Sequence, residues 1–178
     1  MTSVAPALGR AGLVLSLFLI AIPLGAVGAC RTSPSPSLAN AFESPEAVAT
    51  AVLKGLAEGN LEVLRNLAVS EAEFRDLVWP KLPASRPERN LPLDYVWMDL
   101  AAKSDAQLRA RLAGWQDRGF ILVSLEFKGG TDDYGTFRVH RETVLLLKDR
   151  GAREQTGRLF GSMIEHKGRF KVFSYVVD

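Results

Sequence analysis

Cysteine and histidine are scarce in this 178-residue chain, which contains one cysteine, Cys30, and two histidines, His140 and His166. A single cysteine cannot form an intrachain disulfide, so stability must come from an apolar core. The cysteine and histidines do not have the spacing of a zinc site, and the chain lacks a phosphate-binding loop and a nucleophile elbow. These absences argue against metal, nucleotide and hydrolase sites of the common types, and we expect no cofactor.

An excess of one charge is also missing, because 22 Lys and Arg residues face 20 Asp and Glu residues. Arg10 is the only charged residue among residues 1–29, so removing that segment would leave 21 basic residues against 20 acidic ones. A balance this close to neutral gives no electrostatic footprint for DNA or RNA. We therefore expect no nucleic-acid partner.

One apolar segment, residues 11–29, has no charged side chain and follows directly after Arg10. A basic start, an apolar stretch and small residues before a boundary are typical of a secretory signal. A transmembrane helix needs ~20 apolar residues, and Pro23, Gly25 and Gly28 interrupt the second half of this segment. The pattern favours a cleaved signal over a permanent membrane span.

The apolar segment ends in Val27-Gly28-Ala29-Cys30, which resembles the lipobox of bacterial lipoproteins. The resemblance implies cleavage between Ala29 and Cys30, a diacylglycerol on the Cys30 thiol and a further acyl chain, such as palmitate, on the new amine. Each buried methylene contributes ~0.8 kcal/mol, so two or three chains anchor stably. The implied location is the cell envelope. Arg31, in place of aspartate, favours the outer membrane facing the periplasm if the cell is Gram-negative.

The remainder divides into a tether and one domain. Residues 31–42, RTSPSPSLANAF, alternate proline with serine and show no apolar periodicity. Proline-rich chain extends by ~3.1 Å per residue, so this tether would lift the domain roughly 30 Å from the bilayer. We therefore predict a signal peptide over residues 1–29, a lipidated cysteine and tether over 30–42, and one domain over 43–178, a length that suits one core.

The first half of the domain has helical periodicity. Ser44-Pro45-Glu46 predicts a capped helix that ends near Gly59, and Asn60 can cap a second short helix. Ser70 and Glu73 match the capping box of a third. After a proline-rich loop over residues 80–92, two further helices are predicted, one from Leu93 and one that starts with a capping box of Ser104 and Gln107. Alternating residues 91–97 could instead form a short strand.

From residue 120 the apolar period changes from 3.6 to 2, which predicts strands. Lys167-Gly168 predicts a two-residue turn, whose strict register pairs Leu159 with Val176 and Phe160 with Tyr175. The segment "GGTDDYG", residues 129–135, is predicted to be a loop. The four predicted strands cover residues 120–128, 136–148, 155–165 and 169–177.

Helices followed by an antiparallel meander give an α+β layer with N-terminal helices packed on a curved four-stranded antiparallel sheet. This order of elements resembles the NTF2-like, or cystatin-like, roll over about residues 43–177. The resemblance implies a cone with a cavity between helices and sheet. Trp97, Trp115, Phe120 and Phe127 could line such a cavity, but for a domain of this size we expect them to form the core.

Few residues suggest chemistry. His140 and Glu142 lie two apart on one predicted strand face, where we expect a polar surface and no metal site. His166 lies beside a tight turn and is predicted to be solvated. Asp132 and Asp133 lack the spaced oxygen ligands of a calcium loop, so we expect a solvated turn.

Asp94-Tyr95 resembles the acid and phenol that steroid-isomerase-like rolls use in proton transfer, which requires a buried carboxyl beside a cavity. An acid of the first helical turn is the expected role of Asp94. The sequence therefore predicts a membrane-anchored, non-enzymatic binding or assembly module, with an unknown small-molecule ligand or an envelope protein as partner. The alternative is a small-molecule binder or roll-type enzyme that uses the cavity, with Asp94 and Tyr95 as the first residues to test.

Overall fold

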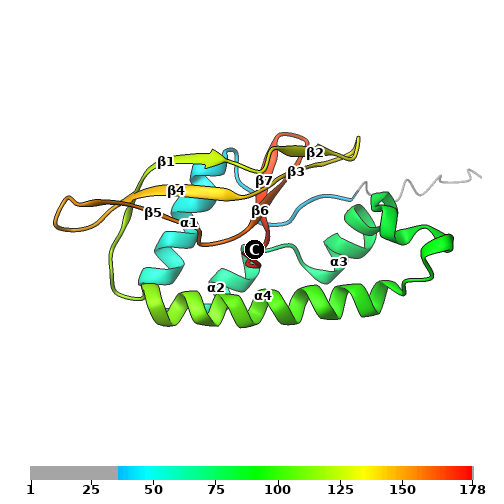
Figure 1. Cartoon of the computed structure of the whole chain (residues 1–178), viewed down its shortest axis with the longest axis horizontal. Coiled ribbons are helices and arrows are strands. Elements are labelled where there is room, and N and C mark those ends of the chain that lie inside the picture. Colours follow the sequence, from blue (N-terminus) through cyan, green and yellow to red (C-terminus); the bar gives the residue numbers. More distant parts are fainter. Residues whose placement is uncertain (1–35, 178) are drawn as a thin grey trace, which may run out of the picture. The chain divides into compact units, whose positions relative to one another are not determined.

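The computed structural model describes residues 36–177, in which helices come first and strands follow (Figure 1). None of the helices among these residues has both the length and the apolar character to cross a membrane. The helical half consists of α1 (Pro45–Ala57), α2 (Leu61–Asn66), α3 (Glu71–Glu73), the π turn η1 (Phe74–Val78), the 3₁₀ turns η2 (Trp79–Lys81), η3 (Pro83–Ser85) and η4 (Pro87–Arg89), and α4 (Leu93–Trp115).

The predicted helix starts are confirmed. The Ser44 hydroxyl accepts a hydrogen bond from Ala47 N at 3.1 Å, with Pro45 as the first helical residue. Asn60 caps α2 in the same way. The capping box is complete, because Glu73 N donates to Ser70 Oγ while Ser70 N donates to Glu73 Oε2 at 2.7 Å. These caps satisfy backbone donors that the first helical turn leaves unpaired.

α4 is one continuous helix, so the predicted break at Ser104 and the alternative strand over residues 91–97 are both wrong. Ser104 and Gln107 do not act as a capping box. Ser104 Oγ accepts a hydrogen bond from Tyr175 N at 3.0 Å. The side-chain amide of Gln107 donates to the Val177 carbonyl and accepts from Val177 N. The two polar side chains that suggested a helix start therefore attach α4 to the end of the sheet.

The strands form two antiparallel sheets, not the single four-stranded sheet that the sequence predicts. The predicted second and third strands are each interrupted, and "GGTDDYG" contributes a short strand of its own. One sheet has the order β1 (Ile121–Phe127), β4 (Thr143–Lys148), β5 (Glu154–Gly157); the other has the order β2 (Thr131–Asp133), β3 (Arg138–His140), β6 (Ser162–His166), β7 (Arg169–Ser174).

Two local features explain the interruptions. Glu142 has a φ of 53°, outside the extended region, so β3 cannot continue into β4. Between β5 and β6, Gly161 lies so close to Val176 that a Cβ at this position would meet the carbonyl oxygen at 1.9 Å. β5 and β6 are thus separate strands, and the chain between them packs closely against the backbone of Val176.

The β6–β7 hairpin has the predicted turn but only part of the predicted register. Lys167 and Gly168 have φ values of 52° and 71°, as in a type I′ turn. The strict register holds as far as Met163–Val172, after which a bulge pairs Ser162 with Ser174. The expected pairs of Leu159 with Val176 and Phe160 with Tyr175 are wrong, because the bulge shifts the ladder before those residues.

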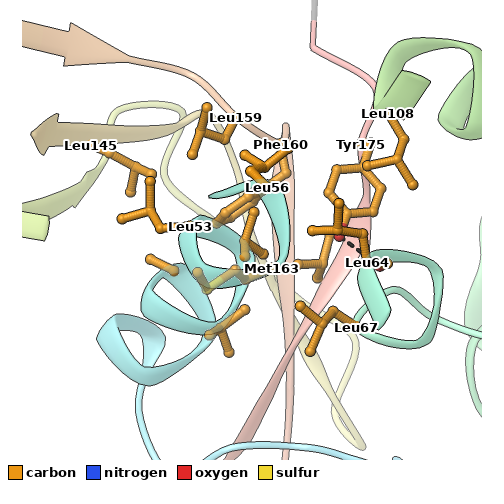
Figure 2. Packing of buried hydrophobic residues seen from close by; sticks show 14 of the residues in the cluster. Leu53, Leu56, Leu64, Leu67, Leu108, Leu145, Leu159, Phe160, Met163 and Tyr175 are labelled. Carbon is orange, nitrogen blue, oxygen red and sulfur yellow. Dashed lines mark hydrogen bonds between the residues drawn. The ribbon is translucent and has the colours of Figure 1, made fainter. Parts of the chain in front are cut away.

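The core has two clusters of buried side chains. The larger cluster lies among α1, α2, α4 and the sheets; Figure 2 shows the Tyr175 ring beside Leu108, with its hydroxyl directed at the backbone of Leu64. The second cluster joins Phe74 of η1 to Phe137, Val139 and Ile164 on the opposite face of the β2-β3-β6-β7 sheet. Figure 1 shows that this sheet lies nearer to α3, while the β4–β5 turn lies at the far end of the domain.

Residues 36–43, here called the strap, lie on the domain, although the sequence predicts a free tether as far as residue 42. Phe42 pairs with Phe170 on the outer edge of β7, and Leu38 packs against the second cluster. Ala39 N donates to Glu73 Oε1 at 2.6 Å. Arg169 reaches the Ala41 carbonyl and the Glu43 carboxylate.

His166 also holds the strap. It is 6% exposed, so the prediction that it is solvated is wrong. One ring nitrogen lies 2.7 Å from the Thr136 carbonyl and the other 3.1 Å from the Pro36 carbonyl. The chain beyond residue 36 is thus fixed to the sheet by backbone and side-chain contacts.

A buried ion pair connects the strap, α3 and β7. Lys171 Nζ lies 3.0 and 2.8 Å from the two carboxylate oxygens of Glu73, and the two side chains are 2% and 6% exposed. Burial alone would raise the pKa of Glu73, but hydrogen bonds from Lys171, Ser70 N and Ala39 N outweigh it and hold that pKa below its usual value.

Replacing Lys171 by methionine should lower the free energy of unfolding at pH 7 by about 3–5 kcal/mol, because the Glu73 carboxylate would remain buried without its cation. The stabilisation from a depressed carboxyl pKa is present above the ordinary glutamate value of 4.5 and is lost as the pH falls below it. The difference between variant and wild type should therefore narrow in acid.

Urea unfolding of both proteins between neutral and acidic pH measures this effect. Lys103→Met is the control, because Lys103 forms an exposed pair with Asp99 and should leave stability unchanged. Equal stability of Lys171→Met and wild type at pH 7 would contradict the role given to the pair.

Candidate functional site

The main candidate is an apolar pocket of 290 Å³ that opens between α4, the segment joining α2 to α3, and the end of β7. Most of its wall is hydrocarbon, and the polar groups are confined to a few positions. The pocket is lined by Arg65, Ala68, Val69, Ser70, Trp97, Leu100, Ala101, Ser104, Asp105, Leu108, Phe173, Ser174 and Tyr175.

One face of α4 supplies nearly half of this lining. Trp97, Leu100, Ala101, Ser104 and Leu108 recur at three- and four-residue intervals, so they share one side of the helix. Leu108 is fully buried and packs in the larger cluster, which holds that end of the face against the domain. Nearer the helix start the small side chains of Ala101 and Ser104 leave space, which the pocket occupies.

The charged groups of the pocket, Arg65 and Asp105, are already paired within the protein. Arg65 Nε donates to Asp105 Oδ1 at 2.8 Å, and Arg65 also pairs with Glu62. Asp105 accepts from Arg109 at 2.8 Å, and the hydrogen bonds from Arg109 and Arg65 together lower its pKa. The carboxylate thus stays ionised and paired, and it is not available as a general acid.

Tyr175 is the polar residue deepest in the pocket wall. Its hydroxyl donates to the Leu64 carbonyl at 2.7 Å, and burial raises its pKa. Ser104 Oγ accepts from the Tyr175 backbone. The lining contains no histidine and no cysteine. An uncharged apolar ligand therefore matches the lining of this pocket best.

Asp94 and Tyr95 do not lie at this pocket. The Asp94 side chain is 80% exposed and lies 3.5 Å from Arg75, while Tyr95 is 66% exposed. Proton transfer by this pair would require a buried carboxyl beside a cavity. The expected role of Asp94 as an acid in the first turn of α4 is confirmed. The exposure of Asp94 and Tyr95 argues against the alternative role as a catalytic acid and phenol.

His140 does not share a face with Glu142, because Glu142 lies at the break after β3. Its ring stacks on Phe127 at a centroid distance of 4.6 Å. Nδ1 lies 2.8 Å from Thr131 Oγ1, and Nε2 lies 2.9 Å from Glu165 Oε2. This cross-strand network fixes the ring and does not line the apolar pocket.

Asp132 and Asp133 form ion pairs with Arg141 and Arg138. Asp133 also accepts from Gly135 N at 2.7 Å, and this bond, followed by Arg138, lowers the pKa of Asp133. Among residues 36–177, no group of three or more His, Cys, Asp or Glu side chains could hold a metal ion. Asp132 and Asp133 therefore lie on β2 and not in the expected solvated turn, and neighbouring arginines pair with both carboxylates.

The four aromatic residues have different roles. Trp97 lines the pocket and lies 5.3 Å from the Phe74 ring, whereas Trp115 packs on Phe120 at 5.0 Å and belongs with Phe127 to the main core. The sequence analysis did not predict this pocket, because the predicted break at Ser104 divided α4 into two helices. One uninterrupted helical stripe from Trp97 to Leu108 was the signal that could have revealed it.

Cys30 and the Ala29–Cys30 cleavage position lie outside the described residues. Comparisons of the chain with protein-family models, with curated proteins and with solved structures found no match.

Replacing Tyr175 by phenylalanine should lower the free energy of unfolding by about 0.5–1.5 kcal/mol, because the buried Leu64 carbonyl would lose the hydroxyl and keep only Leu67 N as a donor. Thermal or urea unfolding measures the loss. Tyr95→Phe removes an exposed hydroxyl and should have no effect. If both variants matched wild type, the hydroxyl of Tyr175 would not fix the pocket wall.

Proposed function

We propose that this chain is a lipid-anchored protein of the bacterial cell envelope whose domain is a non-enzymatic binding module for a small uncharged apolar ligand. The observation that supports it best is the pocket beside α4, whose walls are apolar and whose Arg65 and Asp105 are paired to each other. A ligand with a formal charge would have to break these pairs.

The size of the pocket limits the ligand. Its volume of about 290 Å³ is near the lower end of common ligand sites. A compound of two or three rings or a short alkyl chain fits this space. The displacement of water from an apolar wall favours binding.

The finer description of the domain as an NTF2-like roll is part of the same proposal. It is supported by the order of helices before antiparallel strands and by a pocket between a helix and the end of a strand. The alternative hypothesis of a roll-type enzyme has less support, because Asp94 and Tyr95 are exposed and lie outside the pocket.

The anchor part of the proposal rests on the Val-Gly-Ala-Cys sequence at residues 27–30. Cells grown with labelled palmitate should incorporate the label into the wild-type chain and not into Cys30→Ala, since acylation needs the thiol. The labelled protein should fractionate with membranes, and with the outer membrane in a Gram-negative host. Equal labelling of the two proteins would overturn the anchor.

Filling the pocket should abolish ligand binding. The neutral apolar dye N-phenyl-1-naphthylamine serves as the probe, because its emission rises when it leaves water for an apolar site. Ala101→Phe places a ring in the pocket and should weaken dye binding roughly ten-fold or more, which corresponds to ~1.4 kcal/mol or more. Fluorescence titration of the full chain in detergent, with the emission of the dye in the same detergent without protein subtracted, measures the dissociation constant.

Ala102→Phe is the matched control, because Ala102 is the next residue on α4, is exposed and does not line the pocket. It should bind the dye as wild type does. Equal dye affinity of the Ala101 and Ala102 variants, both with native thermal unfolding, would show that the dye binds elsewhere and would contradict the proposed site.

A further inference from the structure

The strap determines where the anchor meets the domain. Its contacts start at Pro36, whose carbonyl lies 3.1 Å from His166, and continue through Ala39 on Glu73 to the Phe42–Phe170 bridge. Residues 36–43 therefore do not contribute to the free length of the tether. Between the anchoring Cys30 and the strap only residues 31–35 remain.

Five residues allow only a short distance. Even a fully extended chain covers at most ~3.6 Å per residue, so residue 36 lies within roughly 20 Å of the anchored sulfur. A 12-residue tether would have allowed any face of the domain to approach the bilayer. The short connection holds the end of the domain that carries residue 36 close to the membrane.

That end of the domain contains the second core cluster and the loop before α4. Leu38 of the strap, Leu82 of the loop and Val96 of α4 all pack against this cluster. Figure 1 shows the loop and the start of α4 at this end, and the β4–β5 turn at the opposite end. The loop and the first turns of α4 therefore lie at the end of the domain that the short connection keeps near the anchor.

The loop exposes positive charge. Lys81, Arg86 and Arg89 are exposed, and none of them pairs with an acidic residue in the described part of the chain. Glu88 is the single acidic residue of the loop. On the adjoining elements, Asp94 shares Arg75 with Glu71, Asp99 pairs with Lys103, and Asp76 of η1 is exposed.

Large apolar side chains surround these cations. Leu91, Tyr95 and Met98 are 42%, 66% and 69% exposed, and they are three of the six large hydrophobic residues that the described chain leaves exposed. Tyr95 and Met98 are three residues apart and therefore lie on one side of the start of α4, and Leu91 lies just before the helix. Cations beside exposed apolar and tyrosine side chains are the combination found in segments that lie in a membrane interface.

We propose that Lys81, Arg86, Arg89, Leu91, Tyr95 and Met98, here called the proximal patch, dock the domain on the anionic phospholipid headgroups of the membrane that carries its anchor. The cations attract the headgroup phosphates, and the apolar side chains enter the boundary between headgroups and acyl chains. This inference rests on the lipid anchor of the proposed function. It adds the face that meets the membrane and the lipid charge that this face requires.

The test uses the full acylated chain in vesicles, with an environment-sensitive nitrobenzoxadiazole label on a single introduced cysteine. Because acylation consumes Cys30, Met98→Cys is labelled at one position only. The vesicles contain phosphatidylcholine alone or with about one third phosphatidylglycerol. Label emission at position 98 should rise roughly two-fold or more when the anionic lipid is present.

Two controls match the patch. Val123→Cys replaces another exposed apolar residue on β1, and its label should not respond to the anionic lipid. Lys81→Gln, Arg86→Gln and Arg89→Gln together should abolish the response at position 98. Lys148→Gln, Arg118→Gln and Arg150→Gln, which remove the same number and types of exposed cations at the opposite end, should preserve it.

The outcomes separate the two proposals. If the acylated chain does not float with vesicles of either composition, the anchor is wrong, and the proposed function and the docking face are overturned together. If it floats but the label at position 98 gives the same emission with and without phosphatidylglycerol, the docking face is overturned while the anchor stands. An equal response at position 123 also overturns the docking face, because the contact would then have no preferred side.

Discussion

The carboxylate of Glu73 is the group on which the arrangement of this domain most depends. It accepts hydrogen bonds from Lys171 on β7, from the Ser70 backbone at the start of α3 and from Ala39 in the strap. Three segments that are far apart in sequence thus share one buried charge. The pair fixes α3 over the sheet, and it fixes the strap as the point where the chain leaves the domain.

Local signals in the sequence predicted much of the helical half. Ser44, Asn60 and the Ser70–Glu73 capping box mark helix starts because their side chains satisfy donors within the same turn. The division of the strands into two sheets was not predictable in this way. It depends on the positive φ of Glu142, which its residue type does not indicate, and on the close approach of Val176 to Gly161, which only the fold creates.

The candidate site shows the same division between local and long-range causes. The residues that suggested chemistry, Asp94 and Tyr95, are exposed, whereas the pocket is lined by side chains whose types suggest ordinary packing. Ser104 carried the most misleading signal. Its hydroxyl resembles a helix cap in sequence but accepts from Tyr175, 71 residues away, and only the fold brings these two residues together.

The position of Tyr175 also affects the order in which the domain can assemble. Its hydroxyl binds Leu64, 111 residues earlier, and the backbone beyond it is held by Gln107. During synthesis α1, α2 and α4 therefore emerge before the strand that completes their packing. Contacts of such long sequence separation close slowly. A nascent chain of this protein consequently has no finished interior until Tyr175 has been synthesised.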